Sequence, residues 1–382
     1  MSKLTDHLPA DWRDGGFVGR IQLAEGPTPI LIRAGRVIDV SRAAPTTADL
    51  LALKGAASVE GRDLGDLEDF AFAPAWEDRD PDRPQLLSPL DLQCVKASGV
   101  TFAVSAVERV IEERARGDAA RARDIRAALA ERVGADLSAV KPGSEQSAVL
   151  KEALIADGLW SQYLEVAIGK DAEIFTKAPV LSSVGWGDWV GVRADSHWNN
   201  PEPEVVIVCD PTGRPVGATL GNDVNLRDIE GRSALLLGKA KDNNASAAIG
   251  PLIRLFDDGF TMDHLRAATI RLEVSGDDGF VMTGSSSMSL ISRDPLDLVG
   301  QAINPHHAYP DGLMLFLGTM FAPTQDRHGP GQGFTHVVGD LVTISAPELG
   351  ALVNRVVHAD QAPRWNFGIG ALMRNLAGRG LL

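Results

Sequence analysis

Short hydrophobic runs separated by Gly, Pro and Asp make up much of the chain after Phe175. The runs are rich in Val, Ile and Leu and are too short for helices, which is typical of strands. They lie at Val190–Arg193, Glu204–Val208, Thr269–Val274, Gly279–Met282, Leu313–Leu317 and Asp340–Ile344. Because turn residues rather than regularly alternating helices separate them, the pattern predicts a largely antiparallel or mixed β body.

The beginning of the chain has a similar texture, and about residues 15–85 read as a small β-rich unit. Its apolar runs are Phe17–Leu23, Pro29–Arg33 and Gly35–Val40. The charged and proline-containing segment Trp76–Pro84 closes this unit and predicts a linker.

Helical patterns fill the region between the two β-rich parts. Residues 102–116 and 119–133 are rich in Ala, Glu and Arg, and residues 145–157 form a third helical pattern. The predicted fold class is therefore α+β. We expect two domains, a small β-rich one over residues 1–85 and a larger, β-dominated one over residues 86–382.

The composition is that of a globular protein, because 44% of the 382 residues are hydrophobic and 23% are charged. A formal net charge of -14 without any basic stripe argues against a nucleic-acid partner. An acidic protein also repels an anionic substrate, which would need a local cation. The first residues contain no apolar core of a signal peptide, and no apolar run is long enough to span a membrane. We therefore expect a soluble, cytoplasmic protein that does not contact membranes.

Two glutamates at the start of one predicted strand are the first candidates for chemistry. Glu202 and Glu204 flank Pro203 and open the apolar run Val205–Val208. Residues two apart on a strand point to the same side, so both carboxylates would face one way. Alternatively, Glu-Pro-Glu is the solvated opening of an edge strand, where proline and charge discourage pairing with another chain.

A hairpin would bring a third carboxylate to the same place. Asp210–Arg214 reads as a turn, after which the chain can return antiparallel. If the two ends of this turn lie opposite each other, Glu202 falls opposite Asn222, one residue from Asp223. Three carboxylates that converge in this way are stable only when protonated or bound to a hard cation. Ligation by oxygen alone suits magnesium, manganese or calcium, so the sequence predicts a divalent cation site.

Several short motifs accompany these carboxylates. In chain order they are Phe175-Thr-Lys-Ala-Pro179, Glu202 with Glu204, Asp223 with Arg227-Asp228, Lys241 ahead of Gly250-Pro251, Gly318-Thr319 and Gly339-Asp340. The series spans roughly residues 88–357 and resembles the fumarylacetoacetate hydrolase superfamily. The resemblance implies a catalytic domain built as a mixed β-sandwich or roll, with a helical lid at about residues 100–160. It also implies a homodimer or homotetramer.

One branch of this superfamily matches further segments. Residues 237–251, Leu-Gly-Lys-Ala-Lys-Asp-Asn-Asn-Ala-Ser-Ala-Ala-Ile-Gly-Pro, resemble a block of the sugar-acid dehydratases. Gly318–Pro323 and Gly333–His336 look like segments of 2-keto-3-deoxy-D-arabinonate and D-xylonate dehydratases. This alignment implies that Lys241, and not Lys239, is the active-site lysine.

The chain departs from the hydrolases of the superfamily at one point. They carry a Tyr-x-x-His-x-x-Glu element whose His and Glu activate water, whereas the matching residues here are Phe102, Ser105 and Glu108. A serine cannot act as the general base that an imidazole provides near neutral pH. The departure favours a reaction that needs no histidine-activated water over acyl-bond hydrolysis.

The implied activity is that of a metal-dependent dehydratase, a hydro-lyase of pentose catabolism (D-xylose degradation). It would convert 2-keto-3-deoxy-D-pentonate into 2,5-dioxopentanoate, also called α-ketoglutarate semialdehyde. Glu202, Glu204 and Asp223 would hold the divalent cation against the carboxylate and 2-keto oxygens of the substrate. Magnesium is the first choice for this cation, and manganese or calcium are the alternatives.

Catalytic roles follow from the same resemblance. We expect burial near the cation to depress the pKa of Lys241, so that its neutral amine removes the C3 proton. Alternatively, Lys241 binds a carboxylate electrostatically. Glu108 in the helical lid would protonate the departing C4 hydroxyl, or is an ordinary solvated residue of a charged helix. Ser105, at the histidine position, completes the candidate catalytic set.

Four more residues are candidate contacts of the substrate. Lys177 is either a partner of the metal-binding carboxylates or a surface lysine. Arg227, in the Arg-Asp pair, would contact the sugar acid. Ser246 and Thr319 would donate hydrogen bonds to it, or only cap turns.

The sequence also leaves other activities open. They are hydrolysis of an acylpyruvate, decarboxylation of a 2-keto diacid, and non-catalytic binding of a sugar acid. The serine at position 105 argues against hydrolysis but not against decarboxylation. The presence of all three carboxylates and of Lys241 argues against a non-catalytic role.

Overall fold

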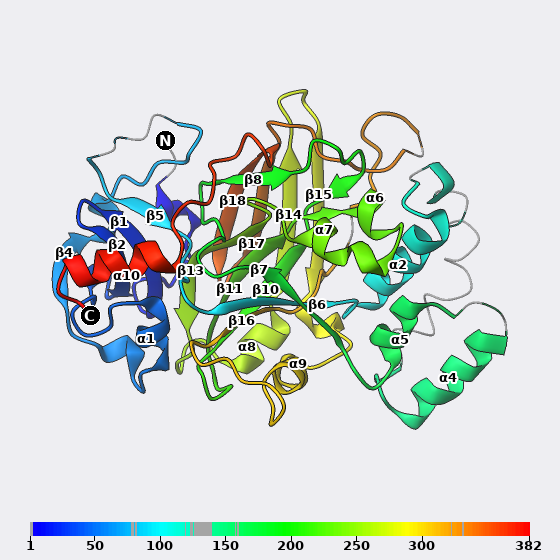
Figure 1. The fold of residues 1–382 in the computed structure, drawn as a ribbon, viewed down its shortest axis with the longest axis horizontal. Coiled ribbons are helices and arrows are strands. Elements are labelled where there is room, and N and C mark those ends of the chain that lie inside the picture. The colour runs from blue at the N-terminus through cyan, green and yellow to red at the C-terminus, as the bar shows by residue number, and fades with distance from the viewer. Residues whose placement is uncertain are drawn as a thin grey trace.

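The computed structural model describes residues 3–77, 80, 82–118, 120–122, 125, 140–156, 158, 160–321, 323–330 and 332–382. Two large sheets form the centre of the molecule, and helices lie around them (Figure 1). Antiparallel and parallel strand pairs both occur. The α+β class and the mixed β body are therefore confirmed.

The larger sheet contains eleven strands among the described residues. Its order is β4 (Arg62–Asp66), β3 (Arg36–Asp39), β2 (Gly26–Arg33), β1 (Phe17–Leu23), β13 (Ala247–Leu255), β11 (Pro215–Asp223), β10 (Pro203–Cys209), β16 (Leu313–Phe316), β6 (Cys94–Gly99) and β7 (Glu173–Ala178), with β5 (Gln85–Leu87) also paired to β1. The strands of the N-terminal region join it through β1, where Phe17 lies opposite Arg254 of β13. The N-terminal strands thus extend the same sheet, and a domain boundary at residue 85 stays a prediction.

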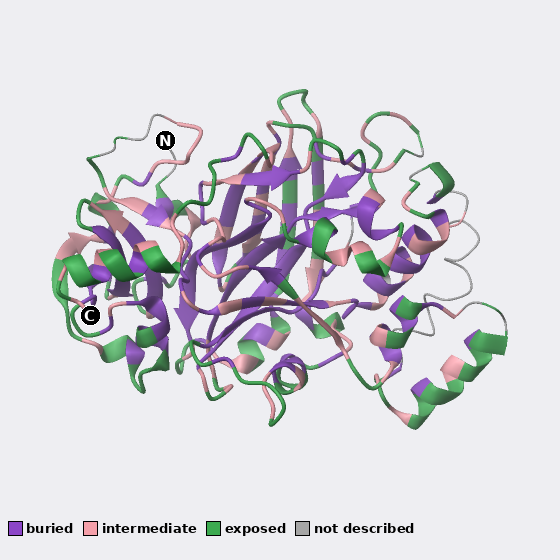
Figure 2. Cartoon of the chain, in the orientation of Figure 1, coloured by how far each residue is buried: buried purple, intermediate pink, exposed green. Residues whose placement is uncertain are grey.

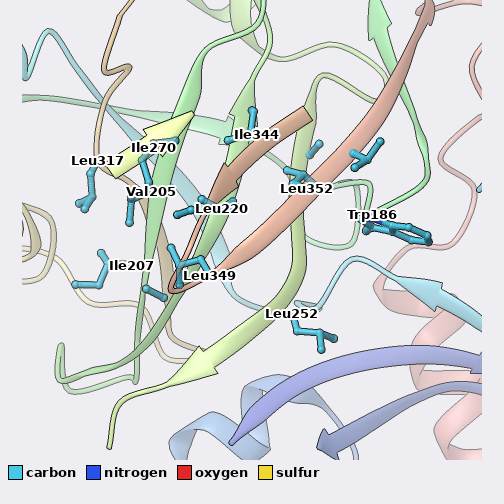
Figure 3. Packing of buried hydrophobic residues seen from close by; sticks show 14 of the residues in the cluster. Trp186, Val205, Ile207, Leu220, Leu252, Ile270, Leu317, Ile344, Leu349 and Leu352 are labelled. Carbon is cyan, nitrogen blue, oxygen red and sulfur yellow. The ribbon is translucent and has the colours of Figure 1, made fainter. Parts of the chain in front are cut away.

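The second sheet packs against the first. It consists of β15 (Val281–Ser287), β14 (Thr269–Ser275), β17 (Leu341–Ala346), β18 (Gly350–His358) and β8 (Trp189–Val192), and a separate pair joins β12 (Asn225–Leu226) to β9 (Asn199–Asn200). Val205 and Ile207 of β10 share one core cluster with Ile270 and Ile344 of this sheet (Figure 3). Alternate residues of β10 lie in a second cluster on the other face. Burial on both faces explains why this strand is a continuous apolar run in the sequence.

Helices cover the ends and outer faces of the sheets (Figure 1). They are α1 (Thr47–Ala52), α2 (Ala103–Ala115), α4 (Glu145–Ala156), α5 (Gln162–Ile168), α6 (Arg227–Glu230), α7 (Leu237–Lys241), α8 (Met262–Ala267), α9 (Pro295–Ala302) and α10 (Ile369–Gly378). Figure 2 shows buried residues concentrated in the strands and exposed ones on the outer helices. The red helix α10 lies beside the N-terminal strands, whereas α2, α4 and α5 lie together at the opposite end.

The helical predictions have two different outcomes. The patterns at residues 102–116 and 145–157 correspond to α2 and α4. The pattern at 119–133 falls mostly outside the described residues, and so does part of the linker predicted at Trp76–Pro84. In the described parts of the chain, none of the helices combines the length and the apolar character needed to cross a membrane.

The β10–β11 hairpin differs from its predicted register by one residue. Pro203, and not Glu202, lies opposite Asn222, because a bulge after Val208 shifts the two strands. Glu202 is instead paired with Asp223, whose backbone N–H donates to the Glu202 carbonyl at 3.1 Å. The bulge could not be read from the turn residues alone.

Replacing Ile207 with alanine is expected to lower the free energy of unfolding by about 2–5 kcal/mol. Ile207 has no exposed surface and lies in an inner strand between β11 and β16, so the substitution leaves a cavity that the sheets cannot close. Thr283→Ala, at an exposed position of β15, is the control and is expected to cost less than about 1 kcal/mol. Urea denaturation of both variants measures the difference, and equal losses would contradict this packing.

Candidate active site

Three carboxylates meet at one end of the β10–β11 hairpin. Glu202 immediately precedes β10, Glu204 is its second residue, and Asp223 is the last residue of β11. Their ligand oxygens lie within 4.8 Å of one another, and all three residues are buried. The side chains therefore converge as the hairpin predicted. The alternative of a solvated edge strand is wrong, because β10 is hydrogen-bonded to a neighbour on each side.

The Gly-Thr motif after β16 holds one of these carboxylates. The backbone N–H of Gly318 donates to Glu204 Oε2 at 2.7 Å. Gly318 has a φ of 99°, and a Cβ atom there would collide with the side chain of Thr101. Glycine is needed because this conformation and close approach exclude a side chain. The backbone of the motif, rather than the Thr319 side chain, thus fixes Glu204.

Two buried lysines contact the carboxylates. Lys177 Nζ lies 2.7 Å from Asp223 Oδ1, and Lys241 Nζ lies 3.2 Å from Asp223 Oδ2. Lys241 also donates to Glu202 Oε2. Lys177 has no exposed surface, so it is a partner of the carboxylates and not a surface lysine.

The pKa of Lys241 shifts in the direction opposite to the prediction. Burial by itself would lower this pKa, but the carboxylates of Asp223, Glu202 and Glu230 together raise it above the usual value for lysine. Burial does lower the pKa of Lys177, and Asp223 opposes that effect. This direction favours the electrostatic role of Lys241 over that of a neutral amine base, and its catalytic role stays a prediction.

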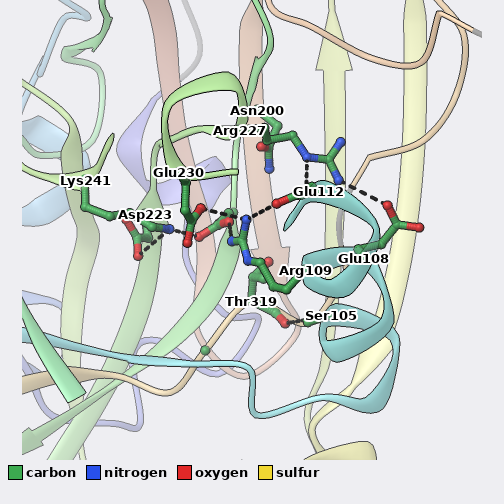
Figure 4. Close-up of polar contacts among 12 residues, drawn as sticks. Ser105, Glu108, Arg109, Glu112, Asn200, Asp223, Arg227, Glu230, Lys241 and Thr319 are labelled. Atoms are coloured by element: carbon green, nitrogen blue, oxygen red, sulfur yellow. Dashed lines mark hydrogen bonds and ion pairs between the residues drawn. The ribbon is translucent and has the colours of Figure 1, made fainter. Parts of the chain in front are cut away.

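Three charged residues that the sequence did not single out line the same cavity. They are Arg109 of α2, Glu173 at the start of β7 and Glu230 at the end of α6. Arg109 Nη1 lies 2.7 Å from Glu230 Oε2, and Arg109 Nη2 donates to Glu202 (Figure 4). Among the described residues, none forms a hydrogen bond or ion pair with the Glu173 side chain.

Burial perturbs both of these additional carboxyl groups. It raises the pKa of Glu230 to about 7, against the opposing effect of Arg109. Burial also raises the pKa of Glu173, and the negative charge of the neighbouring Glu202 raises it further. Sequence reasoning missed these residues because charged residues in polar segments look solvated. The available signal was position, since Arg109 follows the candidate Glu108 directly and Glu230 ends the segment that begins at Arg227.

The cavity between these side chains has a volume of about 10 Å³, enough for one ion or one water molecule. Thr319 also lines it, and its role as a substrate contact stays a prediction. A larger cavity of about 500 Å³ lies between the N-terminal strands and the end of α10. None of the candidate catalytic or metal-binding residues lines that larger cavity, so we place the chemistry at the small one.

The small cavity fits a hard divalent cation. Its candidate ligands are carboxylate oxygens only, the ligand type that magnesium, manganese and calcium prefer. Burial raises the pKa of Glu204 well above its usual value, and Asp223 and Glu202 raise it further. A cation would favour the ionised form of this group. The described lining of the cavity has two cationic side chains, Arg109 and Lys241, and Lys177 contacts Asp223 from outside the lining. It has five carboxyl groups, those of Glu173, Glu202, Glu204, Asp223 and Glu230.

Ser105 and Ser246, two of the candidate residues predicted from the sequence, do not line the cavity but form hydrogen bonds with its wall. Ser105 Oγ donates to the Thr319 carbonyl at 2.5 Å, and Ser246 Oγ donates to the Lys241 carbonyl at 2.8 Å. Both therefore bond to the backbone of a residue that does line the cavity. A catalytic role of Ser105 and a substrate contact of Ser246 stay predictions.

Glu108 and Arg227 also lie behind the cavity wall. Their side chains approach each other at 3.5 Å, and Arg227 Nε donates to Glu112 Oε1 at 2.7 Å. Arg227 is buried, donates to the Pro323 carbonyl at 3.0 Å and stacks on the Trp198 ring. These contacts tie α2 to the body of the protein, so the assigned roles of proton donor and substrate contact stay predictions.

Comparison with solved structures defines the class of fold. The chain superimposes on a 2-keto-3-deoxy-D-arabinonate dehydratase in its apo form with a TM-score of 0.62 and 21% identity, over 90% of this chain and 99% of that one. The fumarylacetoacetate hydrolase of Exiguobacterium antarcticum gives a TM-score of 0.55 and 18% identity over 90% and 99%. The protein therefore has the fold of the fumarylacetoacetate hydrolases, and the predicted resemblance is confirmed.

Two curated relatives resemble the chain in sequence. The 2-dehydro-3-deoxy-D-arabinonate dehydratase of Saccharolobus solfataricus is 30% identical over 184 residues, 48% of this chain and 58% of that protein. A probable 2-keto-3-deoxyxylonate dehydratase of Haloferax volcanii is 31% identical over 194 residues, 51% of this chain and 63% of that protein. The chain thus matches about three fifths of the length of these relatives. No family model matches it.

Proposed function

We propose that the protein is a metal-dependent dehydratase that converts a 2-keto-3-deoxy-D-pentonate into 2,5-dioxopentanoate. The observation that carries the proposal is the buried cluster of Glu202, Glu204 and Asp223 with Lys241 beside it. Two related dehydratases act on such acids by name, and a solved arabinonate dehydratase with this fold is complexed with magnesium and 2,5-dioxopentanoate. That structure has a TM-score of 0.60 and 21% identity over 90% of this chain and 99% of that one.

Glu202, Glu204 and Asp223 are the proposed ligands of the cation. When bound, a divalent cation supplies a Lewis acid that polarises a ketone and stabilises enolate charge. The ammonium group of Lys241 orients Glu202 and Asp223 through its contacts with both. Lys177 does the same for Asp223 from the other side. These two lysines therefore act as cationic anchors in the proposed reaction.

Glu173 is our candidate for the proton transfers. It faces the cavity and, among the described residues, has no ion-pair partner that would hold its charge in place. Burial raises its pKa toward the range in which a carboxyl group both accepts and returns a proton. In the proposed reaction Glu173 removes the C3 proton and returns one to the departing C4 hydroxyl. Proton shifts from C5 then give the terminal aldehyde.

The contacts of Ser105, which occupies the position of the histidine in the hydrolases, agree with an elimination reaction. Ser105 Oγ is buried and donates to the Thr319 carbonyl, so it does not point at the cavity. Activation of water by this residue has no basis in its contacts. The contacts of Ser105 therefore support the proposed dehydratase over an acylpyruvate hydrolase. The homodimer or homotetramer stays a prediction, which sedimentation would test.

Incubation with candidate substrates tests the proposal. Purified protein with magnesium and either 2-keto-3-deoxy-D-xylonate or 2-keto-3-deoxy-D-arabinonate should release a semialdehyde that an aldehyde reagent detects. Acylpyruvates and 2-keto diacids, assayed in parallel, should give no comparable turnover. Turnover of one of these two classes, without semialdehyde from either pentonate, would refute the dehydratase.

Removal of divalent cations is expected to abolish semialdehyde formation. The carboxylate cluster would then hold only its lysine and arginine partners, without the Lewis acid on which the proposed elimination depends. Dialysis against EDTA followed by assay should leave less than about 1% of the activity, a loss of the 10²-fold order typical of removing charge stabilisation. Added magnesium should restore it. Full activity after verified metal removal would contradict the metal assignment.

A further inference from the structure

Arg109 connects the carboxylate cluster to helix α2. Its guanidinium is buried and bridges three carboxylates that belong to three different segments (Figure 4). Nη2 donates to Glu202 ahead of β10, whereas Nη1 lies 2.7 Å from both Glu112 of α2 and Glu230 of α6. An arginine stays charged under all ordinary conditions, so this bridge is a permanent positive charge beside the cluster.

A second arginine secures the other end of the same bridge. Glu112 accepts from Arg109 through one oxygen and from Arg227 through the other, at 2.7 Å in each case. Arg227 begins α6 and is anchored by the Pro323 carbonyl. The docking of α2 on the body therefore includes a chain of alternating charges that ends at Glu202, a proposed metal ligand.

Both oxygens of Glu202 already carry a cationic partner. Oε1 accepts from Arg109, and Oε2 accepts from Lys241. A divalent cation bound by Glu202 would draw on the same negative charge and would repel the guanidinium across it. In a buried site such repulsion is only weakly screened. Cation binding and the hold of Arg109 on Glu202 therefore oppose each other.

The opposition between cation binding and the Arg109–Glu202 contact bears on access to the cavity. Its volume of about 10 Å³ admits an ion, and Arg109 is one of the residues that enclose it. Movement of α2, the wall that carries Arg109 and that the cation weakens, would enlarge the space beside the cation site.

We infer that Arg109 is a positioning residue that makes cation binding and the docking of α2 mutually antagonistic. The inference rests on the proposed function, because the cation site is part of it. In the cation-free protein Arg109 closes the cavity by holding Glu202. Cation binding releases this hold and loosens α2, which gives the keto acid access. By thermodynamic linkage, the free energy by which the cation weakens the docking of α2 equals the free energy by which the docked α2 weakens cation binding.

Calorimetry and hydrogen exchange test the inference without measuring activity. Magnesium is titrated into EDTA-treated wild type and Arg109→Gln, and amide exchange over residues 103–115 is followed with and without magnesium. Magnesium should speed exchange of α2 in the wild type, and Arg109→Gln should bind magnesium about 5–150-fold more tightly, the usual range of such coupling. In Arg109→Gln, magnesium should no longer affect the exchange. Arg109→Lys, which keeps the charge but cannot bridge three carboxylates, should bind magnesium with an affinity between those two.

Arg116→Gln is the matched control, because Arg116 is exposed just after the same helix. It should leave both the affinity and the exchange unchanged. Wild-type protein that binds no magnesium would overturn the cation site and with it the proposed function. Wild-type protein that binds magnesium without faster exchange of α2 would overturn the role of Arg109 alone. The wild-type exchange measurement decides this point even if Arg109→Gln does not fold.

Discussion

Glu204→Gln is expected to abolish magnesium binding and dehydratase activity while leaving the metal-free protein folded. Glutamine has nearly the same shape and can still accept the hydrogen bond that Gly318 donates at 2.7 Å. Burial and two neighbouring carboxylates raise the pKa of Glu204, so a neutral group suits the metal-free site. The loss of a charged ligand should weaken magnesium binding by more than about 100-fold, because even changes behind a ligand cost 10–100-fold.

Thermal unfolding with and without magnesium measures this effect. At a magnesium concentration of about 100 Kd, the wild type should gain roughly 2.7 kcal/mol of stability, and Glu204→Gln should gain none. Glu273→Gln, at an exposed position of β14, is the control and should retain the full gain. A Glu204→Gln variant that is still stabilised by magnesium would show that the cation binds elsewhere.

Glu173→Gln is expected to lower kcat by about 10²–10⁴-fold, the usual contribution of a general acid or base. Glutamine keeps the size of the side chain but can neither accept nor return the C3 proton. Among the described residues, Glu173 forms no ion pair with the cationic side chains of the cavity, so magnesium binding and folding should stay close to those of the wild type. Steady-state kinetics on the pentonate, with calorimetry of magnesium, separates the two effects.

Glu108→Gln is the matched comparison, because the sequence pointed to this residue and the cavity does not include it. Glu108 lies 3.5 Å from Arg227 and contributes to the docking of α2. We therefore expect its replacement to reduce kcat by no more than about 10-fold, as for removal of an outer hydrogen-bond partner. A larger loss for Glu108→Gln than for Glu173→Gln would return the proton-transfer role to Glu108.

Most strands could be predicted because the burial of a strand on one or both faces determines its pattern of hydrophobic residues. Thr269–Val274 alternates between exposed and buried positions and is found as β14, whereas Glu204–Val208 is buried on both faces and is found within β10. The missed register of the β10–β11 hairpin has a local cause. A bulge changes which residues pair without changing the hydrophobic pattern, so Glu202 was placed one residue from its actual partner.

Sequence order was enough to identify the three carboxylates and Lys241, because spacing along one hairpin and a series of motifs carries that information. It determined which residues converge and that their chemistry suits a hard cation. The charge state of Lys241 was decided only by the tertiary structure, since three carboxylates from separate segments outweigh the effect of burial on its pKa. The same holds for Glu173 and Arg109, which reach the cavity from β7 and α2. Electrostatic effects depend on distances in space, and these arise only when distant segments pack together.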